Sequence, residues 1–83
     1  MDKISKFLNS LAKKHRELIL ELIRRIEILD LEGMDIKLLK GHENLWRAKK
    51  GDVRIVFGKE KIEEKMKGNV LMVDFRKDIY KNL

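Results

Sequence analysis

The stretch "LWRAKKGDVRIVF", residues 45–57, decides the fold, because apolar and cationic side chains alternate on both sides of a Lys50-Gly51-Asp52 turn. Alternation with a period of two around a glycine turn is typical of an antiparallel β-hairpin. Successive side chains of a strand point to opposite faces of the sheet. Apolar residues at every second position are enough to build such a hairpin, so the cations at the other positions need an explanation.

The residues after Gly33 are rich in valine, isoleucine and aromatic side chains in short runs, which favours strands. We expect three antiparallel strands at residues 45–50, 53–59 and 69–75, with a charged connection over residues 59–68. The run 61–67 within it is interpreted as a solvated hairpin tip. The helix-facing row is predicted to hold Trp46, Ala48, Val53, Ile55, Phe57, Leu71, Val73 and Phe75. The opposite face is predicted to hold Arg47, Lys49, Arg54 and Arg76, among Leu45, Val56, Val70 and Met72.

The residues before Gly33 show helical periodicity, with apolar side chains recurring at three- and four-residue steps. A single helix from Met1 to Leu29 would be about 40 Å long, far longer than the following sheet could cover. A helical hairpin that bends near residues 13–15 is therefore expected, with Gly33 as the stop. The apolar positions are Ile4, Phe7, Leu8, Leu11, Leu18, Leu22, Ile26 and Leu29. The predicted fold is α+β, with an N-terminal helical hairpin on a small antiparallel sheet.

The composition indicates a single domain over residues 1–83 with an anionic partner. A chain of 83 residues is too short for two cores. It lacks cysteine and any stretch of about 20 apolar residues, so we expect a cytoplasmic protein without a membrane span. The net charge is +6, and residues 34–83 hold thirteen Lys/Arg against eight Asp/Glu, whereas residues 1–33 hold seven against six. Any basic function should therefore lie in the second part.

Two explanations for the cationic row stay open at this point. Lysine and arginine are common on a solvated outer sheet face, where they also prevent edge pairing. Gathering like charges costs free energy, however, which favours a use such as anion binding. Metal catalysis is disfavoured, because no His/Asp/Glu cluster has ligand spacing, and no cofactor is expected. Nucleophile-triad chemistry is unsupported, because the only serines lie on the predicted first helix.

The elements "KLLKGHENLWRAKKGDVRIVF" and "VLMVDFRKDIY" together resemble the RelE/ParE superfamily of bacterial and archaeal toxins, in its RelE-like branch. The resemblance covers about residues 4–80 and depends on the order and spacing of the motifs. The matching elements are Leu39 and Gly41, then Trp46-Arg47-Ala48-Lys49, then Gly51-Asp52-Val53-Arg54, then Arg76 and Tyr80. Family members usually begin with a strand that is missing or very short here, and carry an aromatic residue where this chain has Val53.

The resemblance implies the toxin of a type II toxin–antitoxin pair, a metal-independent endoribonuclease that cuts messenger RNA in the ribosomal A site. The ribose 2′-hydroxyl attacks the adjacent phosphate and leaves a 2′,3′-cyclic phosphate, so an acid, a base and positive charge are needed. Lys49 and Tyr80 are the implied proton-transfer residues, and Arg54 and Arg76 the implied transition-state stabilisers. Arg47, Lys49 and Arg54 are implied to bind RNA phosphates. In some members the catalytic arginine stands slightly earlier, where this chain has Asp74, which would weaken the site.

The same resemblance implies a partner, an antitoxin whose acidic or amphipathic segment covers the basic face. The toxin would be monomeric alone and oligomeric with its antitoxin. Two other functions remain open: a ParE-like inhibitor of DNA gyrase that cuts nothing, and an inactive member that only binds RNA. Packing is the simpler interpretation of Trp46, and Tyr80 could equally hold the C-terminal tail against the sheet. His42 has no paired carboxylate nearby in sequence, which makes it a weak candidate for a base.

Overall fold

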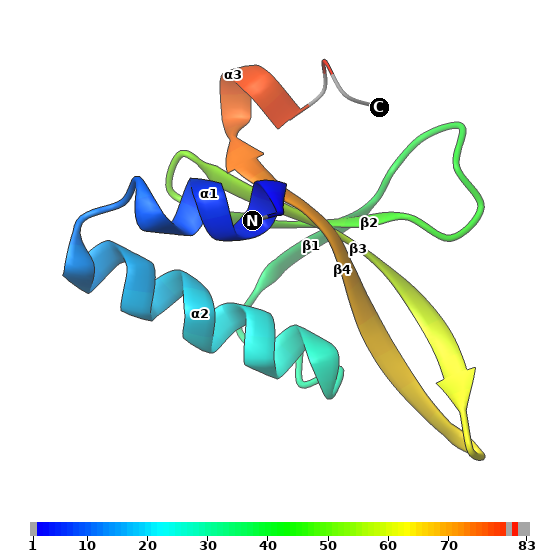
Figure 1. The fold of residues 1–83 in the computed structure, drawn as a ribbon. Helices are drawn as coiled ribbons and strands as arrows, with labels where there is room; N and C mark the ends of the chain where they lie inside the picture. Colours follow the sequence, from blue (N-terminus) through cyan, green and yellow to red (C-terminus); the bar gives the residue numbers. More distant parts are fainter. Residues whose placement is uncertain (1, 80, 82–83) are drawn as a thin grey trace.

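The computed structural model describes residues 2–79 and 81. Figure 1 shows two N-terminal helices beside one twisted sheet, with a short third helix apart from them after the last strand. The elements are α1 (Lys3–Asn9), α2 (Lys13–Glu27), β1 (Asp35–Leu38), β2 (Trp46–Lys50), β3 (Val53–Ile62), β4 (Lys65–Phe75) and α3 (Arg76–Ile79). The strands pair antiparallel in the order β1-β2-β3-β4. The predicted α+β class is confirmed.

The helical hairpin is confirmed, and its bend lies at residues 10–12, slightly earlier than expected. Asp2 caps α1, because its Oδ1 accepts a hydrogen bond from the Ser5 backbone N–H at 2.7 Å. This bond holds the pKa of the Asp2 carboxyl below its ordinary value. The buried side chain of Leu11 anchors the bend in the core. No helix within residues 2–79 and 81 is both long enough and apolar enough to cross a membrane.

The buried stripe of α2 is centred on Ile19 and Ile26, both fully buried. The prediction of Leu18 in this stripe was wrong, because its side chain is 43% exposed and the stripe begins one residue later. The helix ends at Glu27, before the expected stop at Gly33. Leu29 adopts a left-handed conformation with φ 58° and turns the chain away from the helix axis.

Strand β1 was not predicted. It lies at one edge of the sheet and pairs with β2, with Ile36 opposite Ala48. No strand precedes α1 within the described residues, so β1 is not the first strand usual in the RelE/ParE superfamily. The additional strand gives β2 a neighbour on each side and makes it an interior strand.

The charged connection predicted over residues 59–68 was wrong, because β3 and β4 continue through it as a long hairpin that reaches beyond the rest of the sheet (Figure 1). The turn contains only Glu63 and Glu64, both with positive φ. Cross-strand pairs such as Glu60 with Lys67 extend the ladder almost to the tip. Opposite charges in such pairs stabilise a hairpin whose side chains are exposed.

A β-bulge in β4 changes which side chains of this strand reach the core. Val56 pairs with Met72, whereas the next residue, Phe57, pairs with Val70, so Leu71 has no direct partner on β3. The predicted inward position of Leu71 was wrong, since its side chain is 45% exposed. Val70, expected on the outer face, packs against the core instead. An extra residue shifts the alternation by one, and every side chain before it then changes face.

The main core lies between the sheet and the helices α1 and α2, and a smaller buried region lies on the other face. The main core contains Leu8, Leu11, Ile19, Ile26, Ala48, Val53, Ile55, Phe57 and Val73. Val56 and Ile79 are fully buried but do not belong to this core. Helix α3 contacts β3 and β4, and it covers part of the outer face. Part of the outer face is therefore covered rather than open to solvent.

Candidate nucleic-acid interface

Two rows of side chains cross the outer face of the sheet, which is the face away from α1 and α2. The strand register places Arg47, Lys49 and Arg54 together there, as alternation predicts. The first row consists of Asp35, Lys49, Arg54 and Asp74, and the second of Lys37, Arg47, Val56 and Met72. We call the cations of these rows, Lys37, Arg47, Lys49 and Arg54, the outer basic cluster. A carboxylate stands at each end of its first row.

Lys49 is the exposed cation at the centre of the cluster. It lies directly opposite Arg54 on β3, and such paired residues have Cβ atoms about 5 Å apart. On its other side it faces Asp35 of β1. An exposed ammonium group beside a buried guanidinium attracts anions. Phosphate is a common biological anion that can contact several cations at once.

Arg54 is only 5% exposed, which makes it the one charged residue buried within the described part of the chain. Its Nη1 donates hydrogen bonds to the carbonyl oxygens of Gly51 at 2.7 Å and Val53 at 3.1 Å. These bonds hold the β2–β3 turn closed. The charge of Arg54 still acts on the neighbouring surface, but Nη1 is already engaged, so a two-pronged grip on phosphate by this side chain is restricted.

We expect Arg54→Ala to destabilise the protein by about 1–3 kcal/mol, because two backbone carbonyls lose their donor and a buried cavity forms. Urea denaturation followed by circular dichroism measures this loss. Lys49→Ala is the matched control on the same row, and its effect should stay within about 0.5 kcal/mol. Equal stability of both variants would contradict a structural role for Arg54.

Arg47 is held in place by an ion pair across the strands. Its Nη1 lies 3.6 Å from Asp35 Oδ1, and the side chain is only 13% exposed. This nitrogen is buried, and within the described residues it has no hydrogen-bond partner. A buried guanidinium nitrogen without a hydrogen-bond partner costs free energy, and a phosphate oxygen could supply the missing acceptor.

Arg76 lies directly after the last strand, at the end of the sheet. It is the first residue of α3, and its backbone N–H donates to the carbonyl of Asp52 at 2.6 Å. Its exposed side chain lines a hollow together with Asp52, Phe75 and Lys77. Arg76 follows the last residue of β4 and has no register partner in the two rows, so it lies at the end of the sheet beside the β2–β3 turn. Tyr80 lies outside the described residues.

The sequence interpretation missed Asp35 and Lys37, which flank the cluster from β1. Their signal is present in "MDIKLL", where Met34, Ile36 and Leu38 alternate with charged residues. The stretch is short, and this made it easy to overlook. Asp35 matters most, because it neutralises part of the charge of Arg47 and faces Lys49.

The aromatic residue of β2 packs inward, as predicted. The Trp46 ring stacks against Phe57 with centroids 6.2 Å apart, and Lys59 Nζ lies 4.3 Å from the Trp46 ring centroid. This lysine covers the ring with a cation–π contact, so Trp46 is not presented for base stacking. No group of three or more His, Asp or Glu side chains within residues 2–79 and 81 is placed to hold a metal ion.

Comparisons of the chain with protein-family models, curated proteins and solved structures find no match. The resemblance to the RelE/ParE superfamily therefore depends on the motifs of this sequence alone.

Proposed function

We propose that this chain is the toxin of a type II toxin–antitoxin pair, a metal-independent endoribonuclease that cuts messenger RNA on the ribosome and acts in the cytoplasm. The observation that carries the proposal is the pairing of exposed Lys49 with Arg54 on the outer face, next to Arg47 in the adjacent row. Cleavage at a phosphate needs a side chain that can exchange a proton, here Lys49, beside arginines that keep their positive charge. The type of reaction is inferred from the resemblance of the motifs to the RelE-like branch.

Each residue of the cluster has a proposed role in attack by the 2′-hydroxyl on the adjacent phosphate. Lys49 exchanges a proton with the reacting oxygens, and Tyr80 is the second proton-transfer residue. Arg47 Nη1, which has no hydrogen-bond partner within the described residues, donates to a phosphate oxygen and so stabilises the charge of the five-coordinate transition state. Arg54 contributes charge and holds the turn that carries Lys49. Arg76 contacts RNA further along, at the end of the sheet.

A second candidate function is RNA binding without cleavage, as in an inactive member of the same superfamily. Two observations favour it. Asp74 lies directly opposite Arg54, where a carboxylate repels phosphate. The Nη1 donor of Arg54 is bonded to its own backbone. Both candidates use the same outer face, and only cleavage distinguishes them.

The proposed partner is an antitoxin with an acidic or amphipathic segment that covers the outer basic cluster. Carboxylates of such a segment would occupy the place of RNA phosphates beside Lys49 and Arg47, and the toxin would be inhibited by competition for one surface. The toxin is monomeric alone in this proposal and oligomeric with its antitoxin.

Primer extension on messenger RNA in a purified translation system tests the proposal. We expect new 3′ ends within codons that appear only when ribosomes are present and that carry a 2′,3′-cyclic phosphate. Intact message together with RNA binding would support the inactive member instead. Intact message together with blocked supercoiling by DNA gyrase would move the assignment to the ParE-like branch. No effect in any of these assays would contradict the proposal.

A further inference from the structure

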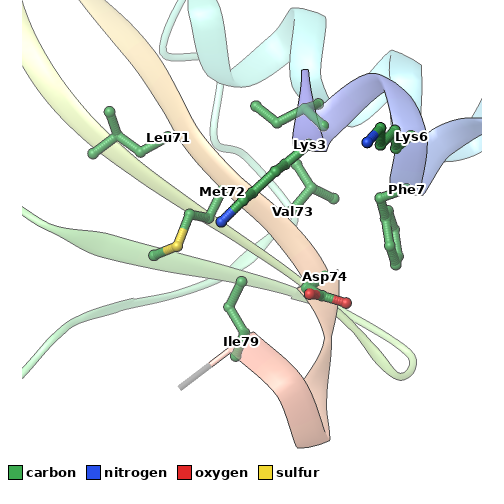
Figure 2. A pocket seen from close by; sticks show the side chains of 9 residues that line it. Lys3, Lys6, Phe7, Leu71, Met72, Val73, Asp74 and Ile79 are labelled. Carbon is green, nitrogen blue, oxygen red and sulfur yellow. The ribbon is translucent and has the colours of Figure 1, made fainter. Parts of the chain in front are cut away.

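The two edges of the sheet differ in how far the rest of the chain covers them. At the β4 edge, Val73 is only 5% exposed, and side chains of α1 and α3 such as Phe7 and Ile79 lie around the strand (Figure 2). Strand β1 forms the other edge, and β2 is the only strand of the described residues that pairs with it. Lys37 and Leu38 of β1 are exposed. The accessible edge of the sheet is therefore β1.

The outward backbone groups of β1 belong to Ile36 and Leu38. The Leu39 N–H, which follows the strand, donates to the carbonyl of Leu45 at 2.8 Å. Backbone groups alternate in direction along an antiparallel strand, so every second residue before Leu39 also turns its groups toward β2. Ile36 and Leu38 lie between these residues and turn their N–H and C=O groups away from β2. These groups are available to another strand.

The charges of β1 match those of the same strand in a second copy, in one register only. Antiparallel pairing with Ile36 at the two-fold axis places Asp35 of each copy opposite Lys37 of the other. Both side chains point to the outer face, where that of Asp35 is 61% exposed. A shift of two residues in either direction would place Asp35 against Asp35 or Lys37 against Lys37, and like charges directly opposite one another destabilise a sheet. The charges therefore favour self-pairing in a single register.

The helix-side face of the same joint is apolar. Leu38 is directly opposite Trp46, so its side chain points to the helix side, and it is 51% exposed. In the register about Ile36, Leu38 of one copy lies opposite Met34 of the other. Met34 lines a hollow of about 230 Å³ between α2 and the sheet, together with apolar side chains such as Leu18. Leu38 of the second copy therefore comes to this hollow and loses its contact with water.

We propose that two copies of this chain join antiparallel through β1, with Ile36 at the two-fold axis, so that two four-stranded sheets become one sheet of eight strands. Backbone bonds of Ile36 and Leu38, the ion pairs of Asp35 with Lys37, and the Leu38 side chains form the joint. The outer faces of both copies point the same way, so two outer basic clusters share one surface. The joint is small, so the free chain stays monomeric when dilute and pairs as its concentration rises. The inference does not depend on RNA cleavage.

Sedimentation velocity over a range of protein concentrations tests the ion pairs by charge reversal. Lys37→Asp alone and Asp35→Lys alone should each weaken self-association by at least about tenfold, because each sets like charges opposite one another. An equimolar mixture of the two variants should associate within about threefold of the unmodified chain, because every pair then joins a lysine to an aspartate. Lys13→Asp changes the net charge as Lys37→Asp does, at the exposed start of α2, and should change association less than about twofold. Equal loss in Lys13→Asp, or a mixture no stronger than the single variants, would overturn the proposal.

Hydrogen exchange followed by NMR locates the joint in the unmodified chain, and it does not require that any variant fold. The amides of Ile36 and Leu38 should exchange more slowly as the protein concentration rises, because they become bonded to the second copy. The Lys37 amide faces β2, so its exchange should be slow at every concentration. Exchange of Ile36 and Leu38 that stays fast from dilute to millimolar protein would overturn the joint at β1.

Discussion

Lys49→Ala is expected to lower the rate of ribosome-dependent messenger RNA cleavage by about 100-fold or more, the usual contribution of a proton-transfer group. The residue is exposed and lies opposite Arg54, so its removal deletes a titratable cation and leaves the core intact. Cleavage is measured by primer extension over a series of times, and folding by urea denaturation.

Lys50→Ala is the matched control for this variant. Lys50 is the next residue of β2, is equally exposed, and pairs with Val53 on the helix-side face. Replacing Lys50 changes the net charge by the same amount as replacing Lys49, but on the helix-side face of the sheet. The cleavage rate should therefore fall less than about threefold. Equal loss in both variants would mean that overall charge, rather than the position of Lys49, carries the activity.

Gly68→Ala is expected to destabilise the protein by about 3 kcal/mol, the largest effect on stability among the substitutions considered. A Cβ atom at Gly68 would overlap the carbonyl oxygen of Ile26 and lie 2.9 Å from its carbonyl carbon. Both are backbone atoms of α2, which cannot move aside without shifting the helix from β4. Thermal unfolding should show a Tm lower by more than about 10 °C.

Gly33→Ala serves as the comparison for Gly68→Ala. A Cβ atom at Gly33 meets no atom within 4 Å, but the residue has φ 78°, a left-handed conformation. This strain costs about 1 kcal/mol. A loss at Gly68 no larger than that at Gly33 would contradict the close approach of α2 and β4.

The parts of the fold that the sequence predicts are those with strong local signals. The hairpin of β2 and β3 follows from strict alternation around Gly51, and the helical pair follows from a long apolar period. Three features were missed for a common reason, since each depends on tertiary partners. Strand β1 has only four residues, the arm of β3 and β4 is stabilised by cross-strand charges, and the bulge at Leu71 interrupts an apolar run of uniform appearance.

The part of the candidate site that follows from strand alternation was also predictable from the sequence. Alternation placed Arg47, Lys49 and Arg54 on one face without any knowledge of the fold. The burial of Arg54 was not predictable, because it results from the β2–β3 turn and from the coverage of this face by α3. Strand β4 ends at Phe75, where the predicted strand also ends, but the start of α3 at Arg76 was not predicted.

The central claim is that RNA binds the outer face of the sheet, opposite α1 and α2. Paramagnetic broadening by a spin-labelled single-stranded RNA tests it most directly, because broadening depends on distance from the label. Val56 is buried beneath the outer face, whereas Ile19 and Ile26 are buried in α2. The account predicts that the methyl signals of Val56 broaden strongly while those of Ile19 and Ile26 persist. Stronger broadening of the two isoleucines, or equal broadening of all three residues, would contradict it.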